Sequence, residues 1–123
     1  MLVNHKKVNS SSYYLTLYIK SRKKVFDQTI SDRCKMIFED IGAQYHIDIN
    51  HWCTEQDHLF ININVQTFGN VADFVEDFKV SSSKILKKEF PQLKRKFWKT
   101  NLWEKDFHLT PVKGYHCSIR TKF

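Results

Sequence analysis

The sequence predicts an α+β fold, a four-stranded antiparallel sheet with two helices on one face, from three observations. Residues 58–65 alternate between apolar and polar side chains, as in a strand with one buried face. Residues 71–86 place apolar side chains at helical spacing ahead of Pro91. Along the chain, the segments follow the order strand, helix, strand, strand, helix, strand. That βαββαβ order is typical of the ferredoxin-like or RRM-like plan, in which one face of the sheet stays open.

The first strand and the first helix are predicted from the spacing of their apolar residues. Residues 13–20 alternate and are rich in aromatic and β-branched side chains, which favours a strand. From Thr29 to Ile41 the apolar residues recur every three or four positions, which indicates a helix, and Gly42 stands where this helix should end. The polar residues 1–12 are interpreted as a flexible N-terminal arm.

The remaining segments form a hairpin, a long helix and a last strand. Residues 45–50 alternate in polarity, and a short connection over residues 54–57 leads to the strand that begins at His58. A helix of about 20 residues, roughly 30 Å long, is expected to end at Pro91. Residues 101–110 contain several large apolar side chains and are predicted to form a fourth strand. We assign all residues, 1–123, to one domain.

Composition and charge narrow the classes of function. A formal net charge of +7 and a pI of about 9.4 favour a polyanionic partner, although basic chains also bind membranes. The three cysteines, Cys34, Cys53 and Cys117, are widely spaced, which argues against a disulfide framework and a thiolate zinc site. The chain has no apolar run of roughly 18 residues and no signal-peptide pattern at its N-terminus. We therefore expect a cytoplasmic protein with no membrane segment.

Positive charge is concentrated in two segments. Residues 84–99 contain seven basic residues and one acid, Glu89, interleaved with three aromatic side chains. Because cations pair with phosphates and aromatic rings stack on bases, this mixture favours single-stranded nucleic acid. The alternative is a solvated helix end whose lysines complement the helix dipole. Residues 22–24 form a second basic cluster, and a nucleic-acid strand could pass between the two if both lie on one rim of the sheet.

His58 begins the third predicted strand on its polar face. Two histidines at positions i and i+2 would point the same way and could hold one divalent metal, but the second position here is Phe60. The pattern is that of a metal site with half of its ligands missing. The alternative is that His58 is simply solvated or hydrogen-bonded.

Four segments share their order and spacing with a known family. Residues 20–26 are similar to its Lys-Tyr-Arg-Arg-Lys-Val-Leu block, and residues 57–60 stand where it has Asp-His-Val-His. Residues 79–91 are similar to its Lys-Gly-Arg-Ser-Ser-Arg-x-Leu-Arg-x-Glu-Phe-Pro helix, and Leu102-Trp103 matches its Leu-Trp pair. From about Tyr13 to Gly114, the chain thus resembles the single-tyrosine HUH transposases of minimal bacterial insertion sequences, which include the REP-associated tyrosine transposases.

The resemblance implies a homodimer that binds single-stranded DNA hairpins at the ends of an insertion sequence during DNA transposition. It also implies that a tyrosine attacks a phosphodiester while a divalent metal, Mg²⁺ or Mn²⁺, sits on two histidines. His58 corresponds to the first metal ligand. The DNA-binding positions implied by the family motifs are Arg22, Lys23, Lys24, Lys79, Ser82, Ser83, Lys84 and Lys87.

Three departures from the family pattern predict impaired cleavage. Phe60 replaces the second histidine, and a phenyl ring has no lone pair for a metal. Counted without gaps from Leu102-Trp103, the position of the family's nucleophilic tyrosine falls on Phe123, which lacks a hydroxyl. In an alternative register that position lies beyond Phe123. The glutamine that usually completes the metal site is missing. The C-terminal catalytic helix is therefore expected to be truncated or degenerate, with Tyr115 as a weak substitute nucleophile.

Three hypotheses follow. The first is a transposase-fold protein that binds DNA hairpins but has lost strand cleavage, serving as a non-catalytic DNA-binding or regulatory protein. The second is an active transposase that recruits substitutes, such as His108 or a carboxylate for the metal and Tyr115 for attack. The third is an interaction module that uses the open sheet to pair with another protein. Binding to polyanions that is insensitive to salt would favour the third, because phosphate contacts release counterions.

Overall fold

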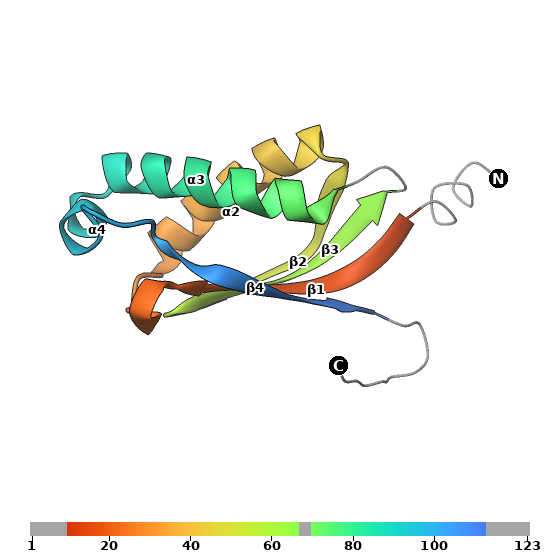
Figure 1. The fold of residues 1–123 in the computed structure, drawn as a ribbon, viewed down its shortest axis with the longest axis horizontal. Helices are drawn as coiled ribbons and strands as arrows, with labels where there is room; N and C mark the ends of the chain where they lie inside the picture. Colours follow the sequence, from red (N-terminus) through yellow and green to blue (C-terminus); the bar gives the residue numbers. More distant parts are fainter. Residues whose placement is uncertain (1–9, 67–69, 113–123) are drawn as a thin grey trace.

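The computed structural model describes residues 10–66 and 70–112, which form a four-stranded sheet covered on one side by helices (Figure 1). The elements follow the order β1 (Ser10–Ile19), the 3₁₀ turn η1 (Lys20–Arg22), α2 (Gln28–Gln44), β2 (Ile47–Glu55), β3 (His58–Gln66), α3 (Val71–Glu89), α4 (Pro91–Lys96) and β4 (Trp103–Pro111). The sheet order is β2-β3-β1-β4, and each neighbouring pair is antiparallel. The predicted α+β fold is confirmed.

β1 lies in the middle of the sheet and begins earlier than predicted. Ser10 pairs with Gln66 on β3, and the carbonyl of Ser12 accepts a hydrogen bond from Val112 N (2.9 Å). The interpretation of residues 10–12 as part of a flexible arm is therefore wrong, because strands on both sides pair with this segment. Residues 1–9 lie outside the described residues.

α2 continues through Gly42, where the sequence pattern predicted its end. Asp27 caps the start of the helix, since its carboxylate accepts from Ile30 N (2.9 Å). At Gly42 an added Cβ would lie 2.8 Å from the carbonyl oxygen of Ile47. The glycine thus permits close approach between α2 and β2 rather than ending the helix.

α3 ends at Glu89 as predicted, but Pro91 has a second role that the sequence pattern did not indicate. It is the first residue of the short helix α4, a position that proline favours because its missing N–H would be unpaired there in any case. After α4, β4 begins at Trp103, two residues later than expected.

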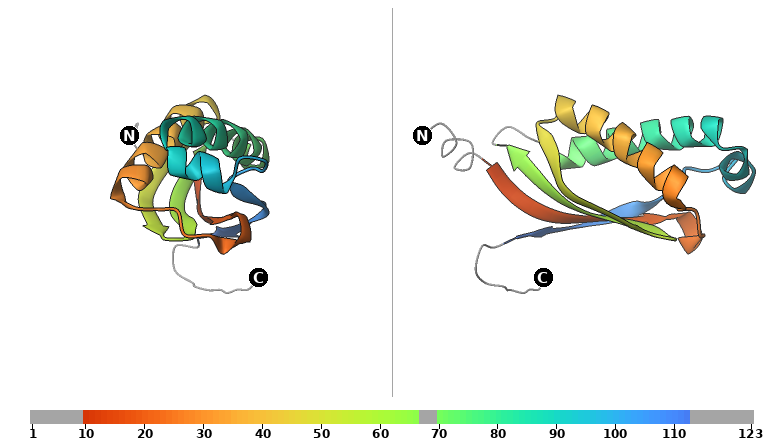
Figure 2. Two further views of the ribbon diagram at one scale, coloured as in Figure 1. Left: turned by 90° about the vertical axis from the view of Figure 1, so that its left-hand side faces the viewer. Right: turned by 180° about the vertical axis from the view of Figure 1, so that it is seen from behind.

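The core lies between the sheet and the helices α2 and α3 (Figure 2). Leu15 and Leu17 of β1 and Leu59 and Ile61 of β3 are fully buried on this face. On the helices, three phenylalanines pack in aromatic contacts with ring centroids 4.7 to 5.9 Å apart, namely Phe38, Phe74 and Phe78. Within residues 10–66 and 70–112, no helix combines the length and the apolar character needed to cross a membrane.

Candidate nucleic-acid interface

The other face of the sheet is not covered by helices in the described part of the chain (Figure 2). The polar side of β3 faces outward here, because Leu59, Ile61 and Ile63 occupy the core side. The residues on this open face include Tyr14, Thr16 and Tyr18 of β1, His51 and Cys53 of β2, His58, Phe60, Asn62 and Asn64 of β3, and His108 of β4. The expectation that His58 lies on the uncovered face is confirmed.

His58 is held in place by its neighbours in sequence and in the sheet. Its Nδ1 lies 2.9 Å from Oδ1 of Asp57, and its ring centroid is 5.4 Å from that of Tyr18. The hydrogen bond to His58, helped by the charge of Arg22, holds the pKa of Asp57 below its ordinary value. A carboxylate on Nδ1 fixes the orientation of the ring and leaves Nε2 as its outer nitrogen.

Phe60 lies on the same face two residues further along β3. Its ring stacks on that of Tyr14 across the β1–β3 ladder, with centroids 5.3 Å apart and planes inclined by 15°. The two side chains are 37% and 39% exposed, respectively. Sequence reasoning did not name Tyr14 and Tyr18 as site residues, although their alternation with Leu15 and Leu17 places them on this face.

The described residues around His58 do not fit a divalent metal. Among residues 10–66 and 70–112, no group of three His, Cys, Asp or Glu side chains could hold an ion. His108 was the candidate substitute ligand, but it lies on β4, and β1 separates that strand from β3. The strands that carry His58 and His108 are therefore two strand spacings, about 10 Å, apart. The ring of Tyr18 contacts both imidazoles. No metal-dependent step is derived for this chain.

η1 brings Arg22 over the open face. Ser21 and Arg22 have positive φ angles of 58° and 54°, which non-glycine residues rarely adopt. The turn is held because Ser21 N donates to Oε2 of Glu104 on β4 (2.7 Å). The guanidinium carbon of Arg22 then lies 3.9 Å from the ring centroid of Tyr18, and the side chain is 3.6 Å from Asp57 and 58% exposed.

The two basic segments predicted from the sequence lie side by side in the structure. Nζ of Lys23 donates to the carbonyl of Lys96 (3.4 Å), and Nζ of Lys96 donates to the carbonyl of Lys24 (3.1 Å). Nζ of Lys23 also lies 5.2 Å from the ring centroid of Phe97. We call these segments, residues 22–24 and 94–99, the basic rim. Residues 22–24 thus adjoin residues 94–99 of the second predicted cluster, whereas Lys84, Lys87 and Lys88 of that cluster lie on α3.

Trp98 is the aromatic side chain of the basic rim that faces solvent. It is 69% exposed, and Nζ of Lys99 lies 4.6 Å from its ring centroid. Phe97, by contrast, is buried in the core, and Phe90 is half-buried against it. Of the three aromatic residues that were predicted to contact nucleic acid in this segment, only Trp98 is well exposed.

Four of the implied DNA-binding positions have structural contacts instead. Ser82 accepts from Nε1 of Trp103 (2.9 Å), and Ser83 accepts from Leu102 N (3.0 Å), so both hydroxyls are buried between α3 and β4. Lys79 is buried, donates to the carbonyl of Lys105, and has its pKa lowered by burial. Lys87 donates to the carbonyls of Phe97 (3.0 Å) and Thr100 (2.7 Å) and thereby caps α4.

The other four implied DNA-binding residues, Arg22, Lys23, Lys24 and Lys84, are exposed. The first three belong to the basic rim, and Lys84 lies on the solvent side of α3. Two further predicted site residues, Tyr115 and Phe123, lie outside the described residues.

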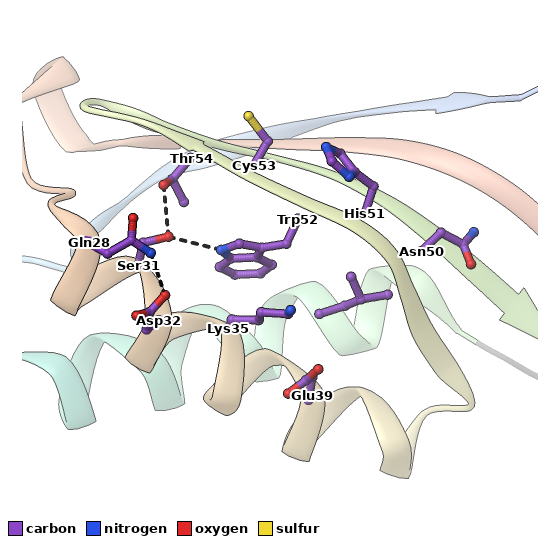
Figure 3. Close-up of a pocket in the computed structure, with 11 residues that line it drawn as sticks. Gln28, Ser31, Asp32, Lys35, Glu39, Asn50, His51, Trp52, Cys53 and Thr54 are labelled. Carbon is purple, nitrogen blue, oxygen red and sulfur yellow. Dashed lines mark hydrogen bonds between the residues drawn. The ribbon is translucent and has the colours of Figure 1, made fainter.

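A separate cleft lies at the β2 edge of the sheet (Figure 3). The hydroxyl of Ser31 on α2 accepts hydrogen bonds from Nε1 of Trp52 (3.1 Å) and Oγ1 of Thr54 (2.9 Å). Next to it, Nε2 of Gln28 donates to Oδ1 of Asp32 (2.7 Å). The two bonds to Ser31 fasten the edge strand β2 to α2, which gives Ser31, Trp52 and Thr54 a structural role.

Comparisons with known proteins agree with this geometry. The sequence model of the family described as "Transposase IS200 like" matches residues 7–122. The ISDra2 transposase TnpA of Deinococcus radiodurans is 29% identical over 100 residues, which cover 81% of this chain and 71% of that protein.

Two solved structures share the fold. A Deinococcus radiodurans structure assigned as a transposase superimposes with a TM-score of 0.75 at 24% identity, over 86% of this chain and 82% of that one. A REP-associated tyrosine transposase bound to a REP hairpin superimposes with a TM-score of 0.61 at 11% identity. This chain is covered to 86% in that match and spans 58% of the other. The chain belongs to the IS200-like transposase family.

Proposed function

We propose that this chain binds DNA hairpins with unpaired flanks, as a transposase-family protein that is impaired in strand cleavage. The observation that supports the proposal most directly is the arrangement of charged and aromatic residues at the open face. An exposed, cationic rim adjoins a site at which His58 has a phenyl ring, Phe60, in place of a second imidazole.

Binding is expected from the rim because its charges are exposed and clustered. Lys24, Lys94, Arg95 and Lys99 are exposed, and the hydrogen bonds from Lys23 to the carbonyl of Lys96 and from Lys96 to the carbonyl of Lys24 hold the two segments together. Clustered cations attract the phosphate backbone and release its counterions on binding. The related transposase solved with a REP hairpin supports a hairpin as the DNA form. By the same family resemblance we propose a homodimer, which light scattering at several concentrations would test.

The test of the whole proposal is a labelled hairpin with single-stranded flanks, incubated with the protein and Mn²⁺. We expect a salt-sensitive complex and no covalent protein–DNA adduct on a denaturing gel, because a phenyl ring cannot bind the metal that activates the phosphate. An adduct on the labelled strand would contradict the loss of cleavage, and its disappearance in Tyr115→Phe would identify the nucleophile. No binding, or binding that does not weaken with salt, would contradict the DNA proposal and favour a protein-interaction module.

The rim predicts a specific change in salt dependence. For single strands, each phosphate contact contributes about −0.7 to the slope of log affinity against log salt. The double variant Lys24→Gln, Arg95→Gln should therefore make the slope shallower by about 1.4, since both side chains lie on the exposed rim. Lys35→Gln, which removes a charge at the β2-edge cleft outside the rim, is the control and should leave the slope unchanged. Equal slopes for the wild type and the double variant would remove the rim from the DNA interface.

A further inference from the structure

We propose that the stacked pair Tyr14 and Phe60 is a binding site for an unpaired nucleobase, with the Arg22–Tyr18 pair holding the adjoining backbone. The inference rests on the proposed DNA binding and names the part of the DNA that the open sheet face would contact. It gives Phe60 a role of its own at the position where a metal ligand is missing.

The first argument is the exposure of this pair. Five large apolar side chains are classed as exposed among the described residues, and two of them, Tyr14 and Phe60, lie in contact on the open face. Their 15° interplanar angle shows that the two rings stack on each other, and both rings remain partly exposed to solvent. A base can stack on such a surface whatever its sequence, because every base has a π face.

The second argument is the chemistry at the edges of the pair. Asn62 pairs with Tyr14 across the β1–β3 ladder, and its side-chain carbonyl accepts from Nδ2 of Asn50 (2.8 Å). Thr16 pairs with Phe60 and separates Tyr14 from Tyr18 along β1. Amide and hydroxyl groups beside an aromatic surface can hydrogen-bond to the edges of a stacked base, whereas a surface built for protein packing is depleted of such groups at its centre.

The third argument is the charge at one end of the face. Tyr18 lies four positions after Tyr14 on β1, which places the two residues about 13 Å apart along the strand. At the Tyr18 end, the exposed guanidinium of Arg22 lies 3.9 Å over the ring, and the basic rim begins. A strand of DNA stacked at Tyr14 and Phe60 would therefore run toward cations that can pair with its phosphates.

The fourth argument concerns the surroundings of the face, which are not uniformly basic. Asp57 lies beside His58, and Asp106 is exposed on β4. Both carboxylates lie toward the Tyr18 end of the face, where Asp57 is 3.6 Å from Arg22, whereas the neutral Tyr14–Phe60 pair lies near the other end of β1. The aromatic pair is therefore suited to uncharged bases, and phosphates would be held by Arg22 together with the neighbouring basic rim.

The experiment measures binding of a fluorescein-labelled oligothymidylate and of a hairpin with unpaired flanks, without added metal. Stacking on one aromatic side chain contributes about 1–3 kcal/mol per base. Phe60→Ala should therefore weaken oligothymidylate binding by roughly 5- to 150-fold. Phe60→Leu, which keeps apolar bulk without a π face, should lose a similar amount, and Phe60→Trp should retain the wild-type affinity.

The controls separate this inference from the proposed function. Met36→Ala, on the helix side of the sheet and 55% exposed, should bind like the wild type. A fluorescent 2-aminopurine base in the unpaired flank should be quenched by the wild type and by Phe60→Trp but not by Phe60→Ala. Circular dichroism should show that each variant is folded, since Phe60 is half-exposed.

Three outcomes would overturn the stacking site. The first is unchanged affinity for both DNAs in Phe60→Ala and Tyr14→Ala while the rim variants lose binding, which would leave the proposed function intact. The second is full retention of affinity and quenching by Phe60→Leu, which would indicate apolar contact without stacking. The third is unchanged DNA binding together with altered self-association in Phe60→Ala, which would assign the face to a second copy of the chain.

Discussion

Trp103→Ala is expected to lower the free energy of unfolding by about 3–5 kcal/mol, the range for removal of a large buried aromatic side chain. Trp103 is 1% exposed at the start of β4 and contacts Phe26 and Phe78, with ring centroids 6.1 and 5.6 Å apart. Its Nε1 donates to the buried hydroxyl of Ser82, which would lose its partner. Since small domains are stable by about 5–15 kcal/mol, urea unfolding should show a large shift in midpoint.

A second substitution at Trp103 and a matched control at Trp98 test this prediction further. Trp103→Phe keeps most of the ring but leaves the hydroxyl of Ser82 unpaired, so a smaller loss of about 1–3 kcal/mol is expected. Trp98→Ala removes the same side chain from the exposed end of the basic rim and should change stability by no more than about 0.5 kcal/mol. Similar losses for Trp98→Ala and Trp103→Ala would contradict the placement of Trp103 in the core.

Phe60→His is expected to create a divalent-metal site together with His58. The substitution places a second imidazole two residues from His58 on the same face, and the carboxylate of Asp57 already orients His58 through Nδ1. A metal that binds only the folded state raises stability by RT ln(1 + [metal]/Kd), about 2.7 kcal/mol at one hundred times Kd. Thermal unfolding of Phe60→His should therefore shift upward with added Mn²⁺ or Co²⁺.

The matched controls are the natural chain and the double variant Phe60→His, His58→Ala. Neither has two imidazoles at this place, so neither should respond to the metal. If the natural chain responds as strongly as Phe60→His, a metal site exists that does not depend on residue 60. If Phe60→His shows no response, the His58 ring does not present its outer nitrogen as the structure indicates.

The sheet was the part of the fold that could be predicted best from the sequence. Alternation has a period of two, so the pattern Leu59, Ile61, Ile63 determines both the strand and the face that His58 occupies. The short helix α4 was missed because a proline after a helix usually marks an end, and the same residue also suits the first position of a new helix. The role of Gly42 was missed because close approach to Ile47 is a tertiary contact.

The site was predicted only in part, for a reason that Ser82 illustrates. Family motifs align positions but do not report which way a helix faces. Phe78, Ser82 and Leu86 are spaced by four residues and share one helix face, so helical periodicity alone would have placed the Ser82 hydroxyl inside the core. The pairing of residues 22–24 with residues 94–99 could not be read from either segment, because it depends on where α4 and η1 meet in space.

The hydrogen bonds that join Lys23, Lys24 and Lys96 have a thermodynamic consequence. Cations held by backbone carbonyls from segments about seventy residues apart exist as a group only when the chain is folded. Ligand affinity and conformational stability are then linked, because DNA that prefers the native arrangement must shift the unfolding equilibrium toward it. On the proposed DNA binding, a core variant such as Trp103→Ala would accordingly release DNA over the same temperature interval in which it unfolds, although Trp103 is buried in the core.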